Sequence, residues 1–149
     1  MTDGCVFCRI IAGELPAHVV LEDEGFVAFL DARPLFPGHV LLVPREHVVT
    51  IMDAPREMLG PLAERTQDVA RAVQAAMESA GIFTAVNNIV SQSVPHLHVH
   101  VVPRNRKDGL RGFFWPRTKY GSDEEAAEVA ARLAAGLTPP AGEDTARGR

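Results

Sequence analysis

Apolar and polar positions along the chain fall into short strand-like runs and one long stretch with a helical period. Glycine, proline and acidic residues separate the runs, and such residues favour turns. The strand-like runs cover residues 18–22, 26–30, 40–43, 83–87 and 97–102. Asp23, Glu24 and Gly25 separate the first two runs and predict a tight antiparallel hairpin.

Two helices are expected in the first half of the chain. Residues 6–12 form a short apolar segment that ends at Gly13, a residue suited to the left-handed position after a helix. A long helix is predicted to begin only at Pro61, because an interior proline loses a hydrogen bond and clashes, and to end at Gly81. Its buried stripe follows three-and-four spacing: Leu62, Thr66, Val69, Val73, Ala76, Met77 and Ala80.

The last helix and the tail follow from local composition. Ser122 and Glu125 form a capping box that predicts a helix through about Leu137. Residues 139–149 hold prolines, glycines and charges with almost nothing apolar, so we expect a disordered tail. Residues 1–138 show no repeat or linker, and we expect one α+β domain built on an antiparallel sheet.

Charge and length limit the possible functions. The chain has 149 residues and a net charge of −4 at pH 7, which gives no general attraction for nucleic acid. No apolar stretch approaches the length that spans a membrane. Residues 1–4 lack the start of a secretory signal. We therefore expect a cytoplasmic protein with no nucleic-acid or membrane partner.

Residues 96–101 alternate strictly as His-Leu-His-Val-His-Val. Because side chains alternate across a strand, this pattern places three imidazoles on one face and the aliphatic residues on the other. A lone histidine is usually a satisfied or exposed side chain, but three adjacent ones are costly to bury without partners and indicate a functional site. They could be three metal ligands, or a nucleophilic histidine flanked by two polar assistants.

Cys5 and Cys8 form a C-x-x-C pair, which is too little for a disulfide framework in a domain of this size. Two thiolates at this spacing can share a tetrahedral ion, but two further ligands are then required. The alternatives are reduced, partly buried cysteines without a metal, or a redox pair. A redox pair of the thioredoxin kind lacks its usual βαβ context here.

The histidine motif at 96–100, with Gln-Ser-Val-Pro at 92–95 and Val-Pro-Arg at 102–104, resembles the His-x-His-x-His signature of the histidine-triad (HIT) family. Further segments resemble family landmarks in family order. They are residues 5–14, 29–31, 37–39, 42–44 and 47. The resemblance implies a HIT fold with an antiparallel sheet of about five strands, one long helix and a C-terminal helix. It also implies a homodimer in which two sheets join.

The resemblance assigns the chemistry to a few residues. It makes His98 the nucleophile on the α-phosphorus, a role that a neutral imidazole with an ordinary pKa near 6.5 can fill at neutral pH. His100 is then expected to face the phosphate oxygens. Gln92 and Ser93 are expected to stabilise developing charge, and Ser93 to help protonate the leaving group. His39 matches a family histidine that hydrogen-bonds near the catalytic ones.

Asp31 matches the ribose-binding acid of the family, since a carboxylate can accept two hydrogen bonds from adjacent hydroxyls. Asn87 matches an asparagine near the ribose. The family's apolar base-binding wall is matched by Phe7, Ile10 and Phe29, for which core packing is an equal alternative. The chain departs from the family pattern before Gln92, where Val90 and Ser91 replace the usual Ala-Gly and the connection is shorter.

In cysteine-containing family members, His47 and His96 match the partners of Cys5 and Cys8. The resemblance therefore implies a closed, structural Zn²⁺ site. Residues 113–115 are consecutive aromatics, which suggests a dimer contact or a lid over the leaving group.

The expected function is a hydrolase that releases a nucleoside monophosphate from nucleoside phosphoramidates or dinucleoside polyphosphates. Its substrates would be purine nucleotides such as AMP conjugates, and its intermediate a covalent nucleotidyl-histidine. The alternatives are a nucleotidylyltransferase with a phosphorylated acceptor, or a zinc-stabilised nucleotide-binding module with little turnover.

Overall fold

The computed structural model of the chain describes residues 4–110 and 118–137. The chain divides into two units, Met1–Gly109 and Leu110–Arg149, each described by itself. The expected tail at 139–149 and the aromatic residues 113–115 lie outside the described residues. Among those that are described, no helix is long and apolar enough to cross a membrane.

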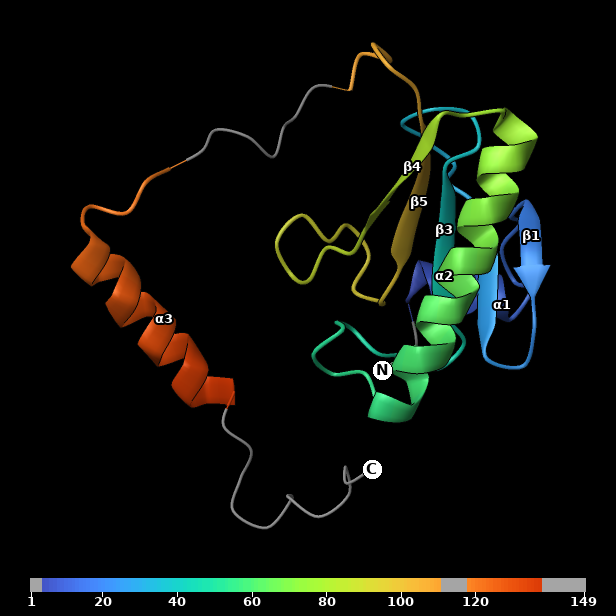
Figure 1. Ribbon diagram of the computed structural model, residues 1–149. Coiled ribbons are helices and arrows are strands. Elements are labelled where there is room, and N and C mark those ends of the chain that lie inside the picture. Colours follow the sequence, from blue (N-terminus) through green and yellow to red (C-terminus); the bar gives the residue numbers. More distant parts are fainter. Residues whose placement is uncertain (1–3, 111–117, 138–149) are drawn as a thin grey trace, which may run out of the picture. The chain divides into compact units, whose positions relative to one another are not determined.

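The first unit contains a five-stranded antiparallel sheet of order β1-β2-β3-β5-β4, as the strand-like runs predict (Figure 1). The strands are β1 Val19–Glu22, β2 Phe26–Leu30, β3 Val40–Pro44, β4 Gly81–Ala85 and β5 Val99–Arg104. The α+β class is confirmed. The last two strands begin two residues away from the predicted positions, because pairing between β4 and β5 rather than local composition sets their ends.

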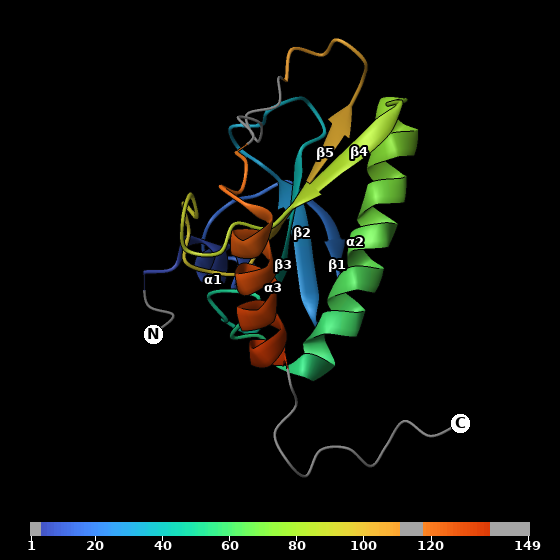
Figure 2. The same cartoon turned by 60° about the vertical axis from the view of Figure 1, so that its left-hand side comes forward.

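Two helices lie on opposite faces of this sheet, α1 (Val6–Ile11) and α2 (Arg56–Met77) (Figure 2). Alternation within β2 explains both layers: Phe26 and Ala28 pack with α2, whereas Val27 and Phe29 pack with α1. The face of the sheet under α1 is therefore apolar along β2, and this is the face that carries His100 of β5 and His98, which precedes that strand.

The start of α2 differs from the prediction of a helix beginning at Pro61, which was wrong. The helix begins at Arg56, and the Met58 N–H donates to the carbonyl oxygen of Pro55 at 2.9 Å. Pro61 lies in the second turn, where it removes one ladder hydrogen bond. Gly60 precedes it and has no Cβ to clash with the proline ring, so the helical backbone continues through both residues.

The end of α2 also differs. The helix stops at Met77, and Glu78 takes the left-handed conformation with φ of 50°, whereas Gly81 already begins β4. Of the predicted stripe, Leu62, Val69 and Val73 are buried. The expectation that the stripe would extend to Ala80 was therefore wrong, because the helix ends at Met77 and Ala80 is exposed.

The short helix α1 ends as the sequence predicts. Gly13 has φ of 78°, and its N–H donates to the carbonyl oxygen of Ile10 at 3.0 Å. The Glu14 N–H donates to the carbonyl oxygen of Arg9 at 2.9 Å, which completes a Schellman motif. At the other end Cys5 is the N-cap, and its Sγ accepts a hydrogen bond from the Cys8 N–H.

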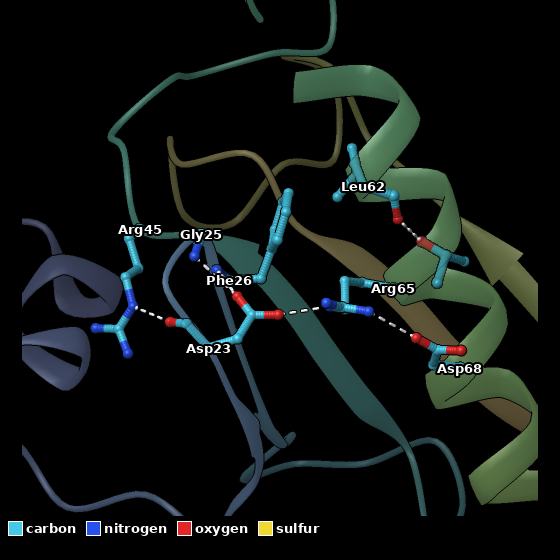
Figure 3. A network of polar contacts seen from close by, with 8 residues as sticks. Asp23, Gly25, Phe26, Arg45, Leu62, Arg65 and Asp68 are labelled. Atoms are coloured by element: carbon cyan, nitrogen blue, oxygen red, sulfur yellow. Dashed lines mark hydrogen bonds and ion pairs between the residues drawn. The ribbon is translucent and has the colours of Figure 1, made fainter. Parts of the chain in front are cut away.

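The turn between β1 and β2 is tied to α2 by Asp23 (Figure 3). One carboxylate oxygen of Asp23 accepts the N–H groups of Gly25 and Phe26, and the other accepts the Nε–H of Arg65. Burial alone would raise the pKa of Asp23, but these hydrogen bonds outweigh it and lower the pKa below its ordinary value. The predicted hairpin is confirmed, and it is held in place by a residue of the long helix.

The second unit contains α3 (Asp123–Leu137), which confirms the predicted last helix. Ser122 caps it, since its Oγ accepts the Glu125 N–H at 3.1 Å. The carboxylate of Glu125 accepts the Gly121 N–H in return, one residue earlier than in the usual capping box.

Candidate active site and metal centre

Four possible ligand side chains converge between α1, the loop after β3 and the segment before β5. They are Cys5, Cys8, His47 and His96. The Cys8 Sγ lies 3.2 Å from the Nδ1 of His47, and the two Nδ1 atoms of His47 and His96 lie 3.2 Å apart. The Nδ1 of His96 is 3.5 Å from each sulfur. The structure therefore brings together all four residues that the sequence analysis assigned to a metal site.

Hydrogen bonding fixes which nitrogen of His96 faces this cluster. Its Nε2 lies 2.8 Å from the carbonyl oxygen of Pro44, so Nε2 carries the proton and donates it there. The Nδ1 lone pair then points at the thiols. Because the ring is fully buried, desolvation lowers the pKa of His96 and keeps it neutral, the form that can bind a metal ion.

The Cys8 thiol needs a cation to lose its proton. Burial, together with the adjacent Cys5 thiol, raises the pKa of Cys8 to about 11. A cation bound between the sulfurs and the imidazoles would displace this proton. The cluster can thus hold a metal ion with four protein ligands.

A cavity of about 690 Å³ lies on the same face of the sheet, next to this cluster. Its lining includes seven of the residues assigned to catalysis or substrate binding: Phe7, Ile10, Phe29, Asp31, Ser93, His98 and His100. A second cavity, of about 300 Å³, lies between α2 and β1 and has an almost wholly aliphatic lining, including Val20, Val69 and Met77. The histidine-lined cavity is the one equipped for chemistry.

His98 is held in one tautomer by its own backbone. Its Nδ1 lies 2.7 Å from the carbonyl oxygen of His96, and since a carbonyl can only accept, Nδ1 carries the proton. Nε2 is left with a lone pair. The ring is 2% exposed and packs edge-on against Phe7, with ring centroids 5.1 Å apart. His98 therefore has the tautomer that attack through Nε2 requires.

His100 is oriented by a chain of hydrogen bonds that begins at a backbone amide. The Leu35 N–H donates to Nδ1 of His39 at 3.0 Å, so the proton of His39 lies on Nε2. That Nε2–H donates to Nδ1 of His100 at 2.9 Å, which leaves the His100 proton on Nε2. His100 is thereby presented as a hydrogen-bond donor. The amide of Leu35 was not among the candidate residues, because a backbone role has no side-chain signature.

Asp31, His39 and His100 also lie close enough to suggest a metal site, with ligand atoms within 4.8 Å. The hydrogen bonds argue against it. With Nδ1 of His39 accepting from Leu35, its Nε2 is protonated and offers no lone pair to a cation. The 3.6 Å separation between Nε2 of His39 and the Asp31 carboxylate is better described as a long, charge-assisted contact.

Asp31 begins the loop after β2 and is fixed on both sides. Its N–H donates to the carbonyl oxygen of His39 at 2.9 Å, and its Oδ1 accepts the Arg33 N–H at 2.9 Å. The guanidinium of Arg33 also lines the cavity, as does the imidazole of His18, which the sequence analysis left aside. The position of Arg33 two residues after Asp31 was the available signal for it.

Three assigned residues are absent from the lining of the cavity: His39, which contacts the cavity residue His100, and Gln92 and Asn87. The Nε2 of Gln92 donates to the carbonyl oxygen of Val49 at 2.6 Å, and its Oε1 accepts the Ile89 N–H at 3.0 Å. Both ends of the amide are therefore occupied in ordering the loop before the histidine motif. This differs from the expected position of Gln92 as a donor to phosphate.

That loop also contains backbone strain where the family pattern has glycine. Ile89 and Ser91 have φ of 73° and 64°, in the left-handed region that costs a non-glycine residue roughly 1–2 kcal/mol. A β-branched side chain is especially unfavourable there.

Replacing Ile89 by glycine is therefore expected to stabilise the protein by up to about 1 kcal/mol, because the side chain is 69% exposed and little packing is lost. The matched control is Val90→Gly, at a position that is also exposed but without positive φ, where glycine should destabilise. Urea unfolding midpoints of both variants measure the difference. If Ile89→Gly and Val90→Gly destabilised the protein equally, the backbone at Ile89 would not be strained.

A pH dependence follows from the His39–His100 pair. Burial and the nearby rings of His98 and His39 lower the pKa of His100 from 6.5 to about 4, although Asp31 opposes the shift. Burial likewise lowers the pKa of His39. Between pH 6.5 and 4 the unfolded chain thus binds more protons than the folded chain. The free energy of unfolding should therefore fall as the pH drops through this range.

The expected slope is at most about 1.4 kcal/mol per pH unit for each such histidine. The His100→Gln variant removes one of these groups and should show a shallower loss of unfolding free energy between pH 6.5 and 4.5 than the unchanged chain, a pH range chosen around the ordinary pKa of roughly 6.5. If the unfolding free energies of the two proteins fell with the same slope, the pKa of His100 would not be lowered in the folded chain.

The comparisons with known proteins agree with this geometry. An uncharacterised HIT-like protein of Mycobacterium tuberculosis is 42% identical over 108 residues, covering 71% of this chain and 75% of its own. An adenosine 5′-monophosphoramidase of Saccharomyces cerevisiae is 33% identical, covering 72% of this chain and 67% of its own.

Solved structures match as well. A HIT family member from Bacillus subtilis superposes with a TM-score of 0.83 at 33% identity, covering 91% of this chain and 99% of its own. A zinc-bound histidine triad protein from Mycobacterium smegmatis has a TM-score of 0.70 at 34% identity, with 91% and 99% covered. The HIT domain model matches residues 12–107. Together with the three alternating histidines, these matches show that the chain belongs to the histidine-triad (HIT) family.

Proposed function

We propose that this chain is a nucleotide hydrolase that releases a nucleoside monophosphate from nucleoside phosphoramidates or dinucleoside polyphosphates through a covalent nucleotidyl-His98 intermediate. The observation that carries the proposal is the pair of opposed tautomers in one cavity. His98 offers a lone pair on Nε2, and His100 offers a proton on Nε2. A nucleophile and a donor side by side suit attack on a phosphate ester or amide.

The reaction would proceed in two displacements. Nε2 of His98 attacks the α-phosphorus, and the bond from phosphorus to the leaving nitrogen or oxygen breaks as that atom takes a proton. Ser93, on the cavity wall, would give this proton, and the His100 N–H would stabilise charge on a phosphate oxygen. Water then attacks the nucleotidyl-His98 phosphorus and gives one proton back to Ser93 as the phosphorus–nitrogen bond breaks, which releases the monophosphate and returns the lone pair to Nε2.

Substrate binding would use the remaining walls of the cavity. The carboxylate of Asp31 can accept hydrogen bonds from two ribose hydroxyls. Phe7, Ile10 and Phe29 supply an apolar wall for the base; Phe7 and Phe29 pack edge to face with ring centroids 5.4 Å apart. The name of the yeast relative, a monophosphoramidase acting on adenosine conjugates, supports a purine nucleotide such as AMP as the released product.

We assign the four-ligand cluster to Zn²⁺ with a structural role. Tetrahedral zinc with bonds of about 2.0–2.3 Å to nitrogen and sulfur separates its ligand atoms by roughly 3.3–3.8 Å. The separation is 3.5 Å between Nδ1 of His96 and each sulfur, and 3.2 Å from Nδ1 of His47 to both the Cys8 sulfur and Nδ1 of His96; these distances lie within or just below that range. Four protein ligands leave no position for water, so zinc would fix α1 and His96 rather than take part in the displacement.

We also infer a homodimer that joins two sheets. Strand β4 pairs with β5 on one side and is an edge of the sheet as described. The edge of a sheet is where a second copy can add its own strand. Light scattering should give twice the 16.1 kDa mass of the chain, and a monomer mass would refute the joined sheet.

A binding module with slow turnover is the second candidate, and one observation favours it. The amide of Gln92 is committed to Val49 and Ile89, so the cavity lacks a donor that the family resemblance would place at the phosphate.

One experiment separates the two candidates. An adenosine phosphoramidate is mixed with the full chain, and AMP release is followed. The reaction is then quenched with acid, and the intact mass of the protein is measured by mass spectrometry. Release together with an AMP adduct mapped to His98 is the expected result. Saturable AMP binding without release or adduct would replace the hydrolase by the binding module.

A further inference from the structure

The short helix α1 belongs to the metal centre and to the nucleotide cavity at the same time. Cys5 caps the helix and Cys8 lies one turn later, so both sulfurs face the centre. Val6, Phe7 and Ile10, from the same six residues, line the cavity. An isolated helix of this length is not stable in water, so its position depends on what holds it.

Phe7 is the side chain that joins the two sites. It lies between the cysteines in sequence and is buried, with 5% of its surface exposed. Its ring packs edge-on against His96, a ligand of the centre, at 5.9 Å between centroids, and against His98, the nucleophile, at 5.1 Å. Displacement of α1 would therefore move a wall that touches the nucleophilic ring.

A second physical connection runs through the backbone of His96. The imidazole Nδ1 of His96 faces the sulfurs, while the carbonyl oxygen of the same residue accepts the Nδ1–H of His98 at 2.7 Å. The group that holds the nucleophile in its reactive tautomer thus belongs to a metal ligand. One connection is packing of the Phe7 ring and the other is a hydrogen bond, and both kinds of contact can carry energetic coupling between sites.

We propose that occupancy of the Cys5, Cys8, His47 and His96 centre sets the affinity of the cavity for nucleotide, with Phe7 as the positioning residue that couples them. The inference rests on the zinc assignment and the nucleotide site of the proposed function. Because coupling between two binding sites is reciprocal, bound nucleotide must in turn retain the metal. The centre would then make nucleotide binding responsive to the supply of zinc.

The test measures zinc loss rather than turnover. The zinc-loaded full chain is mixed with an excess of a chromogenic zinc chelator, with and without saturating AMP, and the rate of zinc transfer is recorded. AMP is expected to slow the transfer at least about fivefold, and AMP should bind the metal-stripped chain at least about fivefold more weakly by calorimetry, the low end of typical coupling.

Two matched variants locate the coupling. Because Phe7 also belongs to the base-binding wall, each variant is tested at an AMP concentration that calorimetry shows to saturate it. Phe7→Leu should then keep the zinc but show little slowing by bound AMP, because the ring contacts to His96 and His98 are lost. Phe26→Leu makes the same change in an equally buried phenylalanine that packs on the α2 face, and it should behave like the unchanged chain. If AMP slowed zinc transfer equally in both variants, Phe7 would not be the residue that couples the two sites.

The outcomes distinguish this proposal from the proposed function. If AMP binds the zinc-loaded chain but leaves the zinc transfer rate unchanged, the coupling is refuted and the nucleotide site stands. If AMP does not bind the zinc-loaded chain at all, the nucleotide site itself is refuted, and the coupling falls with it. A chain that cannot be loaded with zinc would overturn the proposal at its first step.

Discussion

Replacing His98 by alanine is expected to slow AMP release from an adenosine phosphoramidate by roughly 10⁴-fold or more, since loss of a covalent nucleophile removes the two-step route entirely. His100 cannot take over the attack. Its Nδ1 lone pair is engaged by the Nε2–H of His39, and its own Nε2 carries the proton. The measurement is AMP release under single-turnover conditions, with intact mass read for the adduct.

The affinity for AMP provides the control for this variant. Asp31 and the apolar wall remain, so binding should weaken far less than catalysis. Since His98 is buried against Phe7, its removal leaves a gap, and thermal unfolding must show that the variant is folded before the rates are compared. A folded variant that binds AMP and keeps release within tenfold of the unchanged chain would refute nucleophilic catalysis by His98.

The alternating segment at 96–101 shows how much of the site could be predicted from the sequence. Leu97, Val99 and Val101 do enter the core beneath α2, and the histidines take the opposite face. The period of two was enough for this, although only the last part of the segment belongs to the regular strand β5. The choice between metal ligand and nucleophile needed more, and came from the family resemblance.

The tautomers of the histidines could not be predicted, because they depend on backbone groups from distant loops. Pro44 decides the tautomer of His96, and the amide of Leu35 decides that of His39 and, through it, His100. No residue type at those positions carries this information, since any residue offers the same carbonyl, and any except proline the same amide.

In the loop before the histidine motif, the sequence indicated where the chain departs from the family pattern but not where the side chain of Gln92 would lie. The substitution of Val90 and Ser91 for the usual Ala-Gly marks this loop as a departure from the family pattern, and in the structure Ser91 and Ile89 have positive φ. The sequence could not show that Gln92 would turn from the cavity to Val49. That side chain follows the hydrogen bonds available after the loop closes, and these belong to tertiary structure.

Replacing Cys8 by alanine is expected to abolish zinc binding and to lower the free energy of unfolding by at least about 3 kcal/mol, because structural zinc contributes roughly 10–16 kcal/mol of apparent binding energy in small domains. Without a metal the same change removes one half-buried thiol, for which a loss of only about 1 kcal/mol is typical. The size of the effect therefore distinguishes a metal centre from two reduced cysteines.

The measurement combines elemental analysis with thermal unfolding in the presence and absence of a chelator. The unchanged chain should contain about one zinc per chain and lose roughly 10 °C of melting temperature when the metal is removed. The Cys8→Ala variant should already melt at the lower temperature and should not respond to the chelator. Since His96 is both a ligand of the centre and the acceptor that orients His98, the variant should also bind AMP more weakly. If the variant and the unchanged chain respond equally to the chelator, Cys8 does not bind the metal.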